Sequence, residues 1–410
     1  IYEQMLIDSA PGSTGEALLI EEVDNKLLIA KGAENAIDTP LLLATYDLMR
    51  MRPHGEDSDY GYAEKPLDPG ELKAQAPKFA GRKPLYDFLL ANYAFYVAGR
   101  AQDVLTLIPD DSSAKSFSAL EFSRQVLRGQ ALAAMKDKGE EAFWRRLIPG
   151  AVGLYQRPTA ELGLALHYQS AGAIAVVFAA GSPIEDSMIR KIVLYHSADS
   201  AILRAQARNG ERPVAERDLA LFALLYKQLS RGLYAPFLGD LALVRTGADT
   251  QAGLWDLTSQ ETVPLGLFTG GRWSDGYSCP ALRETVATLA RRPQDIPARL
   301  CLGDFYRLNG FDDFSTGGPD KAGELGGGPD PFGGGQIARG AFYPAIIDNP
   351  KAARMDRAYA LYRAVMCYAP SGNNSCGGQE VDESRRKAWF FALKNQYADS
   401  KWAKALKYYW

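Results

Sequence analysis

Four cysteines, all in the last third of the 410-residue sequence, carry its clearest chemistry. Cys279 and Cys301 form one local pair, and Cys367 and Cys376 form another. Neither pair has the two-residue spacing of a zinc site, and no histidine lies nearby, so no metal site is predicted. The spacing favours two disulfides, and the alternative is four reduced, buried thiols. Disulfides would place the protein in the periplasm or outside the cell.

A glycine-rich segment at 310–340 carries the second candidate chemistry, because aromatic and acidic residues cluster in and around it. Glycine lets the backbone approach a partner closely, and aromatic rings with carboxylates suit a sugar or peptide ligand. The alternative is that the segment wraps a concave face and places its phenylalanines in the core. The candidate ligand-binding residues are Trp273, Tyr277, Phe311, Asp312, Asp313, Phe314, Phe332 and Tyr343.

The same segment does not resemble a nucleotide site, because no strand precedes it and no Gly-Lys-Ser/Thr follows. The sequence also lacks the His-Glu-x-x-His and Gly-x-Ser-x-Gly motifs of hydrolases, and its three histidines are scattered. Neighbouring carboxylates such as Asp312 and Asp313 are no evidence of an acid–base pair across a cleft. We therefore expect no catalytic residues and no cofactor, and a hydrolase using these carboxylates is the least favoured possibility.

Charge and hydropathy argue against a nucleic-acid-binding protein and against a membrane-spanning one. The formal net charge of −3 gives no basic field for nucleic acid. Residues 162–184 carry no charge, but glycines, polar residues and Pro183 interrupt them, which favours a buried helix pair over a membrane span. The acidic stretch at 57–61 resembles the start of a calcium loop without its closing glutamate, so a solvated loop is expected.

The sequence begins at Ile1 instead of Met, which suggests that a leader was removed or that the sequence was cut from a longer one.

Apolar residues recur at helical spacing through most of the chain, which predicts an all-α fold. The clearest helix lies at 213–231, opened by Pro213 and ended by Gly232. One long helix is expected from 85 to 107. The expected domains are 1–83 (N-terminal helices and a long loop), 84–244 (a helical array), 245–278 (an irregular insertion or a few short strands) and 279–410 (C-terminal helical repeats with the glycine-rich loop 310–340).

The stretches CYAPSGNNSCGG, RKAWF, LKNQYADSKWAKALKYYW and ERDLALFALLYKQLSRGLYAPFLGDLALV resemble uncharacterised tetratricopeptide-like proteins exported by Gram-negative bacteria. The resemblance covers about a third of the chain. It implies a superhelix of helical hairpins with long loop insertions, located in the periplasm or at the outer-membrane surface. It brings no catalytic residues. A weaker analogy links the chain to helical lipoproteins that capture glycans at outer-membrane transporters.

These expectations favour a non-catalytic scaffold or interaction protein. The expected partner is a protein, and an outer-membrane protein is one candidate. The alternative is capture of an extracellular glycan or peptide by the candidate residues around 310–340.

Overall fold

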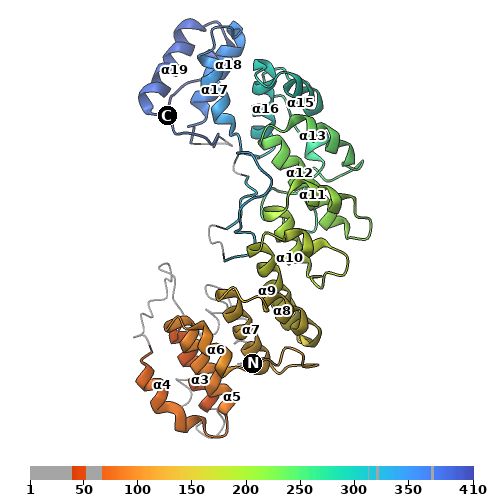
Figure 1. The fold of residues 1–410 in the computed structure, drawn as a ribbon. Coiled ribbons are helices and arrows are strands. Elements are labelled where there is room, and N and C mark those ends of the chain that lie inside the picture. Colours follow the sequence, from red (N-terminus) through yellow and green to blue (C-terminus); the bar gives the residue numbers. More distant parts are fainter. Residues whose placement is uncertain (1–38, 52–66, 313, 320–322, 371–373) are drawn as a thin grey trace. The chain divides into compact units, whose positions relative to one another are not determined.

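The computed structural model describes residues 39–51, 67–312, 314–319, 323–370 and 374–410 (Figure 1). Within these ranges all regular secondary structure is helical and no strand occurs, which confirms the all-α class. The acidic stretch at 57–61 and the candidate residue Asp313 lie outside the described residues. The chain forms two compact units, residues 1–189 and 190–410.

In the first unit the helices pack in the order in which they follow one another along the chain, from α3 through α5, α6, α7 and α8 to α9. The elements are α3 (Thr39–Met51), α4 (Pro69–Gln75), η1 (Ala76–Phe79), α5 (Lys83–Asn92), η2 (Tyr93–Val97), α6 (Ala101–Leu107), α7 (Ala119–Ala134), α8 (Glu140–Leu147), η3 (Ile148–Gly150), α9 (Gln156–Ser170) and η4 (Ile174–Phe178). Between the two units lies α10 (Ser187–Ile192).

The prediction of one continuous helix from 85 to 107 is wrong. α5 widens into the π-helical turn η2, and α6 begins after a break at Gly99. Gly99 has a φ of +64°, a conformation that ends a helix and that glycine adopts without strain. The Arg100 amide, which donates to the Ala94 carbonyl across the break at 2.7 Å, closes the turn. The chain therefore reverses at this point and makes two helices of the array.

The uncharged stretch at 162–184 is divided between the second half of α9 and the short helix η4. α9 ends at Ser170, and a turn with Gly172 at a φ of +67° leads into η4. No helix in the described parts of the chain is both long enough and apolar enough to cross a membrane.

In the second unit, too, each helix packs against the next one along the chain (Figure 1). The helices of this series are α11, α12, α13, α15, α16, α17, α18 and α19. Its elements are η5 (Val193–Ser197), α11 (Ser200–Arg208), α12 (Val214–Ser230), α13 (Tyr234–Asp240), η6 (Leu241–Leu243), α14 (Leu267–Gly270), α15 (Leu282–Arg291), α16 (Ile296–Leu308), η7 (Arg339–Ala341), α17 (Phe342–Ile347), α18 (Arg354–Met366), α19 (Glu383–Gln396) and α20 (Lys401–Ala405). α12 lies at its centre, and all its residues from Leu219 to Ser230 are buried.

The predicted boundaries of α12 are confirmed. Pro213 is its N-cap, and Gly232 follows its end with a φ of +73°. The region 245–278 contains the single turn α14 and otherwise follows an irregular path, as expected for an insertion; the alternative of short strands is wrong.

Both expected disulfides are formed, which excludes four reduced thiols. Cys279–Cys301 ties the chain just before α15 to the middle of α16, the helix packed against α15. Cys367–Cys376 closes the loop that follows α18. By the chain-entropy estimate, loops of these lengths each remove roughly 3 kcal/mol of freedom from the unfolded chain.

Two helical glycines in the first unit make room for one tryptophan. Trp144 of α8 is buried between Gly129 of α7 and Gly163 of α9. A Cβ atom on Gly129 would lie 2.3 Å from Trp144 Cζ2, and one on Gly163 would lie 2.7 Å from the same ring. Both glycines are therefore required by packing, although glycine weakens a helix.

We predict that Gly163→Ala lowers the free energy of unfolding by about 1–3 kcal/mol, because the added methyl group collides with the Trp144 ring. The matched control is Gly239→Ala in α13, where nothing lies within 4 Å of the new Cβ. There the ordinary advantage of alanine in a helix should add about 0.5–1 kcal/mol. Urea unfolding of both variants measures the contrast, and equal signs would contradict the packing argument.

Candidate functional site

The described residues of the glycine-rich segment 310–340 contact the helices of the second unit at several points. Near its start, the hydroxyl of Tyr226 on α12 donates to the Phe314 carbonyl at 2.6 Å. Near its end, the Ile337 amide donates to the carbonyl of Ser230, the last residue of α12, at 2.7 Å. At its last residue, the Gly340 amide donates to the Cys376 carbonyl at 3.0 Å, within the loop closed by the second disulfide. The segment therefore joins α12 to that disulfide loop.

The phenylalanines at the start of the segment are buried in the core of this unit. Phe311 stacks on Tyr226 with ring centroids 5.6 Å apart, and Phe314 meets the same ring edge-on at 4.6 Å. Phe222 of α12 lies 6.2 Å from Phe311 and 5.5 Å from Phe314. Core aromatics already cover the ring faces that a sugar would need for stacking.

A buried ion pair fixes the two ends of the segment to each other. The Arg339 side chain has no exposed surface, and it donates to both Asp312 oxygens at 2.5 and 2.6 Å. Its third contact is a 3.0 Å bond to the Tyr343 hydroxyl. Burial alone would lower the pKa of the guanidinium, but Tyr343 and Asp312 outweigh burial and hold that pKa above its ordinary value. Arg339 therefore remains charged, and its pairing with Asp312 links two residues that are 27 positions apart in the sequence.

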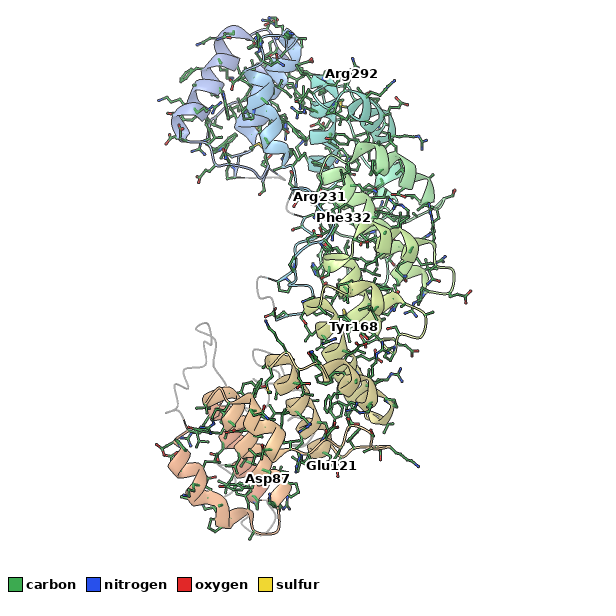
Figure 2. All side chains as sticks on the ribbon, viewed as in Figure 1. Asp87, Glu121, Tyr168, Arg231, Arg292 and Phe332 are labelled. Carbon is green, nitrogen blue, oxygen red and sulfur yellow. A yellow bond between two sulfur atoms is a disulfide. The ribbon has the colours of Figure 1, made fainter. Side chains whose placement is uncertain are left out.

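A second charged cluster holds the middle of the segment. The Lys227 ammonium of α12, fully buried, donates to the His196 carbonyl at 3.0 Å and lies 3.5 Å from Asp330. Arg231, one turn further along α12, pairs with the same carboxylate and lies 5.1 Å from the centre of the Phe332 ring. Figure 2 shows Arg231 and Phe332 next to each other. Burial lowers the pKa of Lys227 to about 8, although Asp330 opposes that change.

Glycine allows the segment to pass close to His196. A Cβ on Gly326, whose φ is +91°, would lie 2.9 Å from the imidazole Cδ2 atom. The imidazole Nδ1 lies 3.1 Å from the Thr316 carbonyl, also in the segment. Burial is the main cause that lowers the pKa of His196. His196 therefore contacts the segment as a neutral side chain near pH 7.

A cavity of about 320 Å³ lies between the segment, α12, α16 and the disulfide loop. Its walls combine aromatic rings, hydroxyl and amide groups, the buried ion pair and glycine backbone. The lining residues are Tyr226, Ser230, Tyr306, Phe311, Asp312, Phe314, Ser315, Gln336, Ile337, Ala338, Arg339, Cys376, Gly377 and Gly378. This volume is near the lower end for small-molecule pockets, and a single large side chain would fit.

The structure brings together only some of the sequence-predicted residues. Phe311, Asp312 and Phe314 line the cavity. The hydroxyl of Tyr343 accepts a hydrogen bond from Arg339, which also lines it. Phe332 lies beside the charged cluster on α12 instead.

The two remaining candidates lie elsewhere in the unit. Tyr277 stacks on Tyr359 of α18 with ring centroids 4.6 Å apart, and its hydroxyl donates to Asp356 at 2.9 Å. The Tyr359 hydroxyl in turn donates to the buried Asp304 carboxylate. Trp273 is half-buried in the irregular region 245–278.

Sequence reasoning missed Tyr226, Tyr306 and Arg339 as members of the site. Tyr226 lies in the apolar stripe of α12, where spacing alone marks it as an ordinary core residue. Arg339 carried a usable signal, because a lone arginine beside a buried helix start needs a carboxylate, and Asp312 lies at the other end of the same segment.

In the described ranges no group of three or more His, Cys, Asp or Glu side chains is placed to hold a metal ion. No protein-family model matches the sequence, and no curated protein or solved structure matches it either.

We predict that Asp312→Asn lowers the free energy of unfolding by about 3–5 kcal/mol, because it leaves the Arg339 charge buried without its partner. Replacing both residues, Asp312→Leu with Arg339→Met, should restore most of this loss. The exposed pair of Asp348 and Arg385 is the control, since Asp348→Asn should cost under about 1 kcal/mol. Denaturant titration measures all three, and similar losses for the two aspartates would contradict the assignment.

A pH prediction follows from Lys227. Its pKa of about 8 lies below the ordinary 10.5, so between these values the folded state has released a proton that the unfolded chain still holds. The stability of the native protein should therefore rise with pH across this window, by about 3 kcal/mol relative to Lys227→Met. Urea unfolding of both proteins at pH 7 and pH 10.5 measures the difference. Parallel pH profiles would refute the burial effect on Lys227.

Proposed function

We propose that this chain is an exported helical-repeat protein of the periplasm or outer-membrane surface, and that it works by binding a partner protein. In this proposal the cavity beside the glycine-rich segment holds a side chain of the partner. The observation that carries the proposal is the cavity itself, with its mixed lining from four separate segments of the second unit.

The packing order supports the repeat architecture. Each helix from α11 to α19, apart from the single turn α14, packs against the next helix in sequence, the nearest-neighbour arrangement of a solenoid. A superhelix of tetratricopeptide-like hairpins is the specific form that we propose. The long segments 245–278 and 310–340 are then insertions between helices, as they are in repeat proteins whose loops carry the binding function.

The two disulfides support export, because disulfides persist in oxidising compartments. The location at the outer membrane rests on the sequence resemblance and belongs to the proposal.

The chemistry of the cavity favours a protein partner over a sugar. Stacking on a sugar needs an uncovered ring face, whereas Phe311 and Phe314 pack against Tyr226 and Phe222. An inserted side chain instead needs an apolar wall with a few polar groups at the rim. Ser315 and Gln336 are exposed and line the same cavity, so they supply that polar rim.

Photo-crosslinking tests the proposal. A photoreactive phenylalanine analogue at Ser315 should give one discrete crosslinked protein when the chain is expressed in its exporting host and irradiated. The control position is Ser259, an exposed serine of the same unit that does not line the cavity. Ser315→Trp should narrow the cavity and weaken co-purification of the same protein by on the order of tenfold, equivalent to about 1.4 kcal/mol, while Ser259→Trp should not.

Equal crosslinking at both positions, or none at Ser315, would contradict binding at the cavity. A crosslinked carbohydrate in place of a protein would favour glycan capture, the alternative drawn from the sequence.

A further inference from the structure

The C-terminal end of the described chain carries a charge opposite to that of the whole. Residues 384–410 contain seven basic residues and one acidic residue, a net charge of +6, whereas the full sequence has a net charge of −3. The acidic residue, Asp399, is paired with Arg354. Arg385 is paired with Asp348, and the Lys394 ammonium donates to the Ala403 carbonyl. Lys387, Lys404 and Lys407 are exposed, so positive charge remains on this part of the surface and favours an anionic partner.

Aromatic side chains gather on the same part of the surface. Phe390 and Phe391 of α19 contact each other, and Tyr409 of the chain after α20 packs on Phe390 with ring centroids 5.6 Å apart. Tyr408 and Trp410 form a further pair at 6.4 Å. Phe391 is 47% exposed and Tyr408 is 65% exposed, so these rings are not part of a core.

Lysines alternate with these rings. The Lys387 ammonium lies 5.7 Å from the centre of the Tyr409 ring, and the Lys394 ammonium lies 5.5 Å from that of Phe390. These four residues, with Phe391, make one continuous surface, which we call the aromatic–lysine face. Lys407 directly precedes Tyr408 in the chain and is exposed.

α19 has one buried apolar side and a second side on which a phenylalanine lies between two lysines. Trp389, Leu393 and Tyr397, the side that faces the unit, are buried. Lys387, Phe391 and Lys394 have helical spacing on another side. One exposed phenylalanine is ordinary on a protein surface, but here Phe391 lies between two lysines and beside Phe390 and Tyr409, and this combination of rings and charge is what the inference uses.

We infer that the aromatic–lysine face binds the surface of an anionic lipid bilayer. Aromatic rings that combine an apolar body with a polar edge concentrate at the depth of lipid headgroups, and lysines reach from there to headgroup phosphates. Each lysine near an anionic bilayer contributes about 1 kcal/mol, which is roughly a fivefold change in affinity. Here lysines and rings lie on one face, so both effects act at once.

The exposed phenylalanine selects a bilayer over an anionic polysaccharide. A polysaccharide offers phosphate or carboxylate groups to the lysines, but it has no apolar region in which to bury Phe391. The interfacial layer of a bilayer offers both. The inference does not depend on the cavity, because none of the residues lining the cavity belongs to this face.

Vesicle co-sedimentation of the full chain tests the inference. Vesicles of phosphatidylcholine with about a third phosphatidylglycerol should bind the protein, and pure phosphatidylcholine should bind it at least tenfold more weakly. Raising the salt from 50 to 500 mM should release it, because screening weakens attraction to the charged surface.

Two variants separate the two contributions. Lys387→Glu should weaken binding by roughly fivefold or more, and Phe391→Ser should also weaken it by about fivefold, with the salt dependence kept. Lys138→Glu and Trp255→Ser, exposed residues outside this face, are the matched controls and should leave binding unchanged. Circular dichroism checks that all variants fold, as their exposure leads us to expect.

Equal binding to neutral and anionic vesicles would overturn the inference, as would full binding by the lysine variant or by the aromatic variant. Retention on dextran sulfate without retention on vesicles would assign the face to an anionic polymer and would also overturn it.

Discussion

A buried guanidinium must keep its carboxylate, and in this protein that constraint shapes the second unit. Arg339 has no exposed surface and Asp312 almost none, so separating them would leave a charge in the core. The pair closes the glycine-rich segment into a loop, with its first and last residues held at α16 and η7. The chain between Asp312 and Arg339 must therefore begin and end at the same ion pair. The two ends of a segment that looks unstructured by composition are therefore held in defined positions.

Glycine makes this path possible. An ordinary side chain at Gly326 would collide with His196, and one at Gly340 would lie 2.2 Å from the Gly377 carbonyl. Glycine loses the most conformational freedom on folding, so a segment this rich in it orders only if strong contacts offset that loss. The two charged clusters, Asp312 with Arg339 and Asp330 with Lys227 and Arg231, supply such contacts at separate points. Glycine therefore allows the segment to pass close to its neighbours, and the buried charges offset the entropy that glycine loses on folding.

The sequence predicted the elements that depend on local physics and missed those that depend on distant partners. Spacing, with Pro213 at the start and Gly232 after the end, located α12. Cysteine spacing gave both disulfides, because each bridge links residues close in the chain. The break at Gly99 was missed because apolar periodicity continues through it, although the glycine was a visible signal.

The candidate site was predictable only in part for the same reason. Phe311, Asp312 and Phe314 were identified from composition, but their burial against Tyr226 depends on contacts across 85 residues or more of sequence. No periodicity reports such a contact.

The second disulfide joins the compartment of the protein to the shape of its cavity. Cys376 offers its carbonyl to Gly340, and with Gly377 and Gly378 it forms one wall of the cavity. In the reduced chain Cys376 would lose its short covalent connection to α18, and Gly377 and Gly378, which directly follow it, would lose this anchor. The ion pair of Asp312 with Arg339 and the hydrogen bond from Ile337 to Ser230 would still hold the end of the glycine-rich segment, whereas Cys376 would keep only its hydrogen bond to Gly340. One wall of the cavity therefore depends on the second disulfide, which links the proposed binding function to the oxidising conditions in which disulfides persist.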